Sequence, residues 1–221
     1  MIRQEEYALK TIDLKGIGTL RQIREGINDW LFALEFPYGD LYEAQELHEE
    51  GRPVRSNRLL LVHLPDATVY EPVHKKDCVI FGQPVYCDGK IGIMAVDFFT
   101  ENIRVYQFST EDASCVQLAE MALSEVKDCY NLMLHSSPLM LTRQPNDGTF
   151  DIIWPERRTF PIGSRETFYG AENGRMFFST WVEDPDYHEH TVVRSYPDGE
   201  LIEELKGNID LLPDGQWWYM V

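Results

Sequence analysis

The chain has 221 residues, of which 20 are Lys or Arg and 37 are Asp or Glu, giving a formal net charge of −17 at pH 7. Hydrophobic residues make up 43% of the sequence, which is too much for a disordered chain and enough for a packed core. Because nucleic acids and anionic membrane surfaces are themselves negative, the charge argues against both as partners.

The cysteines and the N-terminal residues indicate in which cellular compartment the protein is expected. The four cysteines, Cys78, Cys87, Cys115 and Cys129, have no Cys-x-x-Cys spacing, so we predict neither a zinc site nor a disulfide framework. The N-terminal residues lack a long apolar stretch, and no apolar run reaches the ~20 residues that span a bilayer. We therefore expect one soluble cytoplasmic domain over residues 1–221 with reduced thiols.

Short stretches of β-branched and aromatic residues recur along the chain. We predict strands at residues 30–36, 58–63, 91–96, 139–141, 176–182 and 217–221. Turn dipeptides lie between them at Asp88-Gly89, Asp147-Gly148, Asn173-Gly174, Asp198-Gly199 and Asp214-Gly215. Such Asx-Gly pairs supply the positive φ angles that tight hairpins need. Many short strands with hairpin turns predict an all-β fold.

A turn followed by a strand repeats along the chain. The turns at Asp88, Asn173 and Asp214 each precede a strand, and residues 136–142 fill the gap between the first two. Successive units are about 40–50 residues apart, which is the length of a four-stranded propeller blade. Further strands follow within the units, at residues 103–108, 149–153, 191–196 and 201–205.

In repeat length and hairpin pattern the chain resembles the β-propeller superfold. At roughly 44 residues per blade, the resemblance implies about five four-stranded blades. Residues 217–221 would form the second strand of the last blade, and residues 7–14 would supply its missing outer strands. This pairing of the N- and C-terminal strands would close the ring and remove exposed sheet edges. Neither the WD signature nor the kelch glycine pair is present, so no specific family is implied.

Two segments are compatible with helices instead. Residues 109–112 resemble a capping box, and polar residues follow at helical spacing, at Gln117, Glu120, Ser124 and Lys127. A helix at 110–127 would make the fold α+β, which is our alternative. Residues 19–27 also place three apolar side chains on one helical face, although a glycine at position 26 weakens that helix.

The densest polar cluster lies after the predicted strand at 176–182. His188 and His190 are two residues apart, so on a strand both imidazoles would share one face. Asp184 lies in the preceding loop, and Trp181 is the last residue but one of the strand. We predict that Trp181, Asp184, His188 and His190 belong to a ligand-binding surface. Two histidines do not make a metal site, and we expect no bound metal.

A second interpretation is catalytic. Glycosidases on five-bladed propellers place carboxylates on inner strands, and such chemistry needs two carboxyl groups about 5–10 Å apart. The candidate carboxylates on or beside predicted strands are Glu35, Asp97, Asp151 and Glu183. The tryptophans suited to stacking on a sugar are Trp30, Trp154 and Trp181. No spacing in the sequence selects a pair.

Other motifs are absent or weak. Lys15-Gly-Ile-Gly18 resembles the start of a dinucleotide loop, but Arg21 stands at the third glycine position. The P-loop, Gly-x-Ser-x-Gly and His-Glu-x-x-His patterns are missing, so we expect no cofactor. The C-terminal rings Trp217, Trp218 and Tyr219 are compatible with an aromatic binding patch, but we expect alternate rings to face the core and solvent, as a strand demands.

The sequence does not determine the function. Our leading hypothesis is a non-catalytic binding module of propeller type, whose ligand is a protein or a small molecule. The enzymatic alternative is a carbohydrate-active hydrolase that uses two inner-strand carboxylates. A third possibility is an acidic protein that neutralises a basic partner through charge complementarity.

Overall fold

The computed structural model describes residues 11–221 except 24–26, 37–38 and 213–215. The described residues form 19 β-strands, one α-helix and a short 3-10 turn. The strands make five sheets, and every strand pair is antiparallel. The expected all-β class is therefore confirmed. None of the described helices has the length and apolar composition that crossing a bilayer requires.

The first two sheets form one half of the molecule. The first sheet consists of β1 (Arg21–Gln22), β2 (Trp30–Leu34), β3 (Leu59–His63) and β4 (Thr68–Tyr70). The second consists of β5 (Val79–Phe81), β6 (Val85–Cys87), β7 (Lys90–Asp97), β8 (Asn102–Ser109) and β9 (Cys115–Ala122). β5 pairs with one end of β7 and β6 with the other. These two short strands therefore share one row, and the second sheet also has four rows.

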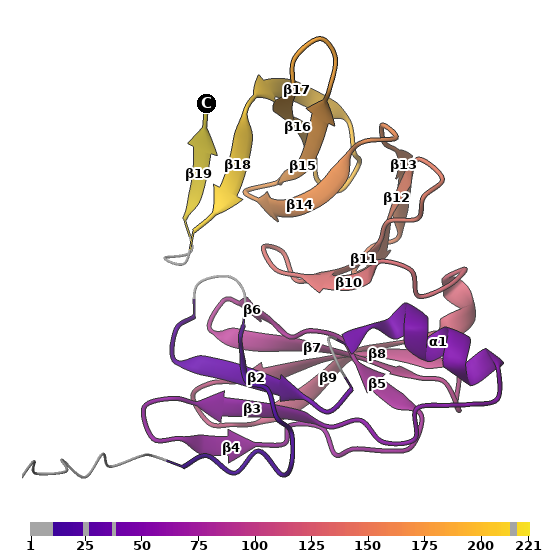
Figure 1. Cartoon of the computed structure of the whole chain (residues 1–221), viewed down its shortest axis with the longest axis vertical. Helices are drawn as coiled ribbons and strands as arrows, with labels where there is room; N and C mark the ends of the chain where they lie inside the picture. The colour runs from indigo at the N-terminus through magenta and orange to yellow at the C-terminus, as the bar shows by residue number, and fades with distance from the viewer. Residues whose placement is uncertain (1–10, 24–26, 37–38, 213–215) are drawn as a thin grey trace, which may run out of the picture.

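The remaining sheets follow in chain order. The third sheet consists of β10 (Leu132–His135), β11 (Met140–Arg143), β12 (Thr149–Trp154) and β13 (Arg158–Pro161). The fourth consists of β14 (Thr167–Glu172), β15 (Arg175–Val182), β16 (His188–Ser195) and β17 (Leu201–Lys206). The fifth is a hairpin of β18 (Asn208–Leu211) and β19 (Trp217–Met220). In Figure 1 these three sheets describe an arc above the first two.

The predicted repeat is present in the strand order. The strands that follow the turns at Asp88 and Asn173 are β7 and β15, and each is the second row of its sheet. The turn at Asp214 lies outside the described residues, but β19 is likewise the second strand of its hairpin. A series of four-rowed antiparallel sheets in chain order is consistent with a propeller-like fold.

The predicted ring closure is not seen. Residues 7–10 lie outside the described part of the chain, and the described residues 11–14 form no strand. Within the described residues, β19 pairs with β18 alone. The last sheet therefore has two strands where the others have four rows.

Both predicted helices are wrong where the structure describes them. β8 ends at Ser109 and β9 occupies Cys115–Ala122, so the segment 110–127 is a hairpin turn, an outer strand and a short 3-10 turn at Leu123–Glu125. The polar residues of the supposed capping box stabilise that turn, since Asp112 Oδ1 accepts the N–H of Ser114 at 3.0 Å. In the segment 19–27, Arg21–Gln22 is β1 and pairs with β2.

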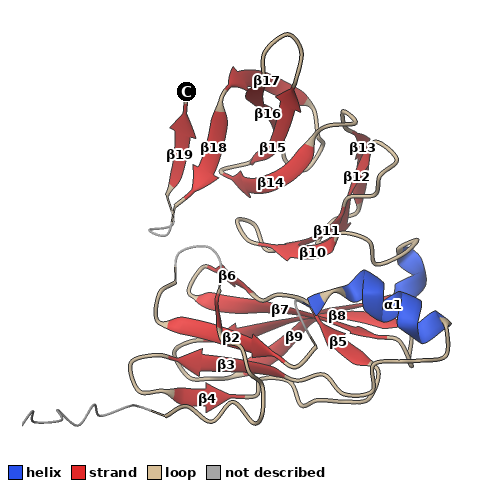
Figure 2. Ribbon diagram, in the orientation of Figure 1, coloured by secondary structure: helices blue, strands red, loops and turns tan. Residues whose placement is uncertain are grey.

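The one α-helix of the described residues, α1 (Leu41–Glu49), was not predicted (Figure 2). Asp40 is its N-cap and accepts the N–H of Glu43 at 3.0 Å, which satisfies one of the free donors at the helix start. Leu41 and Ala44 are its buried residues. The Gln45 side chain accepts the N–H of Cys129 at 2.7 Å, so α1 is tied to the segment that leads into β10.

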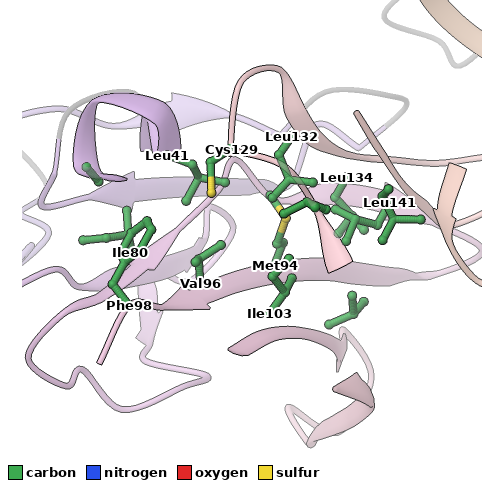
Figure 3. Close-up of a cluster of buried hydrophobic side chains, with 14 of the residues drawn as sticks. Leu41, Ile80, Met94, Val96, Phe98, Ile103, Cys129, Leu132, Leu134 and Leu141 are labelled. Atoms are coloured by element: carbon green, nitrogen blue, oxygen red, sulfur yellow. The ribbon is translucent and has the colours of Figure 1, made fainter. Parts of the chain in front are cut away.

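A hydrophobic core joins α1 to the second and third sheets. Figure 3 shows side chains from α1, β5, β7, β8, β10 and β11 in one cluster: Leu41, Ile80, Met94, Val96, Ile103, Leu132, Leu134 and Leu141. Cys129 is buried in the same cluster, and desolvation raises the pKa of its thiol to about 12. The thiol is therefore protonated and acts as a small apolar side chain.

Candidate functional site

A cavity of about 880 Å³ lies where the first strands of the sheets meet. Its wall includes residues from the first row of every sheet: Gln22 on β1, Val85 on β6, Leu132 on β10, Phe168 on β14 and Leu211 on β18. Its size falls within the range of small-molecule sites. The five sheets thus converge on one hollow, as the inner strands of a propeller do around its axis.

The first turn of α1 and the link between β5 and β6 complete the wall. Leu41 and Tyr42 reach the cavity from α1, while Gly82, Gln83 and Pro84 reach it from the link. The link interrupts the first row of the second sheet, because β5 and β6 pair with opposite ends of β7.

A β-bulge in β14 shapes the wall. The pairing of β14 with β15 shifts between Phe168 and Gly170, so Tyr169 is an extra residue in the strand. Consecutive side chains of a regular strand point to opposite faces, yet Phe168 and Tyr169 both line the cavity. Gly170 leaves room for the Trp217 ring, because a Cβ there would lie 2.4 Å from that ring. Trp217 also lines the cavity.

Six rings in the cavity wall form three edge-to-face pairs. Tyr42 and Tyr130 have centroids 5.5 Å apart at 89°. His135 and Phe168 are 4.7 Å apart at 84°, and Tyr169 and Trp217 are 5.9 Å apart at 72°. Edge-to-face pairs are favoured by the ring quadrupoles, so these rings support one another without closing the space.

The polar groups of the wall are mostly uncharged. Side-chain amides come from Gln22, Asn28, Gln83 and Asn131. Among the described lining residues the only carboxylate is Asp40, and there is no Lys or Arg. An aromatic wall with scattered amides can hold a ligand by stacking and hydrogen bonding.

The predicted surface around Trp181 lies elsewhere. None of Trp181, Asp184, His188 and His190 lines the cavity. His188 pairs with Val182 and His190 with Thr180 across β15 and β16, whereas Trp181 pairs with Glu189. Direct partners share a face and consecutive residues alternate, so Trp181 points away from the face that carries the two histidines.

The histidine pair itself forms as expected. The rings of His188 and His190 have centroids 4.8 Å apart, and His188 Nδ1 lies 2.6 Å from the carbonyl oxygen of Asp186. Trp181 is 40% exposed, and the Arg165 guanidinium lies 5.2 Å from its ring centroid. Within the described residues, no group of three or more His, Cys, Asp or Glu could hold a metal ion.

The four candidate carboxylates also lie outside the cavity wall. Asp97 accepts the N–H groups of Phe99 and Thr100 at 3.1 and 2.9 Å and lies 3.2 Å from Arg104. Asp151 accepts the hydroxyl of Thr159 at 2.7 Å. Glu35 accepts the hydroxyl of Ser56 at 3.1 Å, and Glu183 is exposed in the loop after β15. The first two carboxylates hold turns and neighbouring strands in place.

The tryptophans divide between core and surface. Trp30 is buried between Tyr70 and Phe108, with centroids 5.5 Å from each ring, so it is a core residue. Trp154 packs against the core shown in Figure 3. At the C-terminus, Trp217 packs against Phe177 and Trp218 is half exposed, as the expected alternation requires, but Tyr219 is exposed as well, so the alternation does not extend to the third ring. Trp217 lines the cavity, so one ring of the aromatic patch considered from the sequence lies in its wall.

No family model matches the chain, and no curated protein matches it. Among solved structures, the chain is similar to a bifunctional GH43-CE protein of Bacteroides eggerthii, with a TM-score of 0.40 and 9% sequence identity. The match covers 90% of this chain and 30% of the other, so the chain spans less than a third of that protein.

Proposed function

We propose that the protein is a binding module whose five sheets act as the blades of a propeller and whose small-molecule ligand enters the cavity between their first strands. The observation that carries this proposal is the 880 Å³ cavity, which all five sheets line and whose wall is rich in aromatic and amide side chains. Such a wall provides stacking surfaces and hydrogen bonds without requiring any covalent chemistry.

The placement of the carboxylates favours binding over glycoside hydrolysis. Hydrolysis needs an acid and a second carboxylate on opposite sides of the scissile bond. The four candidates, Glu35, Asp97, Asp151 and Glu183, are not in the cavity wall. Asp40 is in the wall, but its Oδ1 already accepts a backbone N–H of α1.

The test uses the indole N–H signals of the five tryptophans in a nitrogen-15 NMR spectrum. Indole, cellobiose and choline are added separately at millimolar concentration as small aromatic, neutral polar and cationic probes. We expect at least one probe to shift the Trp217 signal and to leave the Trp218 signal in place, because only Trp217 lines the cavity. If no probe moves the Trp217 signal, the binding function is wrong.

A variant that blocks the cavity distinguishes binding there from binding elsewhere on the surface. Met133 lies in the cavity wall and is partly exposed, so Met133→Arg should fold and obstruct the cavity. Val116 on β9 is similarly exposed and lies outside the wall, which makes Val116→Arg the matched control. The probe shifts should disappear in the first variant and persist in the second.

The same spectra compare the cavity with the surface predicted from the sequence. That surface, built on Trp181, Asp184, His188 and His190, remains a second proposal for ligand contact. Loss of probe binding in His190→Ala and its retention in Met133→Arg would favour that surface. The opposite result would favour the cavity.

A further inference from the structure

We infer that the ligand of the cavity carries an alkylated ammonium group, such as a quaternary ammonium. This inference rests on the proposed binding function and names its ligand class. It follows from three features of the wall: the arrangement of its rings, the signs of its charges and the neutral or apolar character of its remaining side chains.

The six aromatic rings of the wall form three pairs whose ring planes are nearly perpendicular. In each of the three pairs the ring planes are 72–89° apart, so two aromatic surfaces meet nearly at right angles. Tyr42 and Tyr130 make one such corner, and Tyr169 and Trp217 make another. Aromatic faces attract cations through the ring quadrupole, and clusters of such rings bind methylated ammonium groups.

The charges at the wall favour a cation over an anion. The described lining residues include Asp40 but no Lys or Arg, so an anionic group would meet no cationic partner there. Tyr169 donates its hydroxyl to Asp210, which places another carboxylate behind the wall. Around Tyr42, Glu46 is the main cause of a raised tyrosine pKa, which indicates a negative local potential. The net charge of −17 adds a long-range attraction for cations.

Alkylation is inferred from the hydrogen-bonding groups. A primary ammonium has three N–H donors and needs acceptors for all of them when it is desolvated. Apart from Asp40, which caps α1, the side-chain acceptors of the described wall are uncharged, and uncharged acceptors pair less strongly with an ammonium N–H than carboxylates do. A group that carries methyls instead of N–H donors needs no acceptors and packs its methyls against rings and aliphatic side chains such as Leu134 and Met133.

Titration calorimetry with two matched probes tests the inference. Choline and its neutral isostere 3,3-dimethylbutan-1-ol have the same shape and differ in charge. We expect choline to bind at least about tenfold more tightly at 20 mM salt. We also expect its affinity to fall several-fold at 0.5 M salt, because screening weakens the negative field of the protein.

Tyr42 supplies the matched variants, because its partial exposure makes misfolding of the variants unexpected. Tyr42→Phe keeps the ring and should retain choline affinity within about twofold, whereas Tyr42→Leu should lose about fivefold or more. Phe99→Leu, at a ring that is 80% exposed in a turn, is the control and should change nothing.

The outcomes separate the two proposals. If indole or cellobiose shifts the Trp217 signal but choline binds no more tightly than its isostere, the cation inference is wrong and the binding function stands. If no probe reaches Trp217, both are wrong. Equal losses in Tyr42→Phe and Tyr42→Leu would also overturn the inference, since the hydroxyl rather than the ring face would then hold the ligand.

Discussion

Arg143 on β11 is a buried charge with a specific structural role. Its Nη2 lies 2.7 Å from Asp128 Oδ1, and its Nη1 lies 3.5 Å from Asp151 Oδ2 on β12. Its Nε also donates to the carbonyl oxygen of Asp128 at 3.0 Å. One guanidinium therefore joins the segment before β10 to two strands of the third sheet, next to residues that line the cavity.

We predict that Arg143→Met destabilises the protein by about 3 kcal/mol, because two carboxylates then lose their cation in a poorly solvated position. The free energy of unfolding in urea measures the effect. Arg175→Met is the matched control, since Arg175 is half exposed and lies 3.7 Å from Glu203, and it should cost less than about 0.5 kcal/mol. Equal costs at the two sites would show that burial is unimportant here.

Asp97 should make the stability depend on pH. Burial would raise the pKa of Asp97, but the hydrogen bond from Thr100 and the Arg104 guanidinium outweigh it, so the pKa lies below its usual value of 3.8. A carboxyl with a lowered folded-state pKa stabilises the fold above its unfolded-state pKa and loses that contribution as the pH falls through the folded value.

The wild type should therefore exceed Asp97→Asn in unfolding free energy at pH 6, and the gap should narrow as the pH falls below about 4. Urea unfolding of both proteins at pH 6 and pH 3 measures the gap. Asparagine keeps an oxygen for the N–H groups of the turn and removes the charge that faces Arg104. A gap that stays constant with pH would contradict an ionised Asp97 in the fold.

At the scale of single elements, β9 shows why a strand resembled a helix in the sequence. The pairing of β8 with β9 shifts at Val105 and Tyr106, which leaves Leu118 as an extra residue in β9. The bulge brings Gln117 and Glu120, three residues apart, to one side, where their side chains are 3.3 Å apart. Polar residues three positions apart on one face are typical of a helix. Here a bulge on an outer strand places them on one side.

Local sequence patterns predicted strands correctly where a turn signal directly precedes a run of strand-favouring residues. The strands at residues 91–96 and 176–182 were predicted because each follows an Asx-Gly turn and is rich in residues that favour strands. Helix α1 was missed although its start carries a signal, namely Asp40 followed three residues later by Glu43. The helix buries only Leu41 and Ala44, so its sequence has no long apolar face that would predict a helix.

Gly170 on β14 should control the position of the hairpin β18–β19. A Cβ at this position would lie 2.4 Å from the Trp217 ring, so Gly170→Ala must displace the ring that fastens the hairpin to β14. We expect a loss of about 1–3 kcal/mol and a shift of the Trp217 indole signal. Gly18→Ala is the control, because no atom lies within 4 Å of its Cβ position. An unchanged Trp217 signal in Gly170→Ala would show that the hairpin is held by other contacts.

At the scale of the whole molecule, the sequence predicted the sheets but not the cavity. Blade length and hairpin turns are local features of the sequence, so about five sheets of antiparallel strands could be predicted from it. The cavity wall combines residues as distant as Gln22 and Trp217, whose proximity depends on how all the sheets are placed. No short motif encodes that proximity. The histidine cluster attracted attention because its residues are close in sequence, although Trp181 faces the other way.

The net charge of −17 sets a further property of the whole molecule, because excess charge of one sign opposes the compact state. Salt screens this repulsion between exposed groups more than it screens close, buried pairs such as Arg143 and Asp128. We therefore predict that raising NaCl from 20 to 200 mM increases the thermal midpoint by about 2 °C or more.

Neutralising exposed acids should reduce this salt dependence. Four exposed acids are suitable, in the combined variant Asp77→Asn, Glu111→Gln, Glu200→Gln and Glu204→Gln; the first three lie in turns or connections and the last lies on β17. The variant should unfold at a higher temperature than the wild type at 20 mM NaCl, and the two midpoints should converge at 200 mM. A midpoint that falls with salt in the wild type would mean that screened ion pairs outweigh the repulsion. The stability of the fold would then depend on local pairs rather than on net charge.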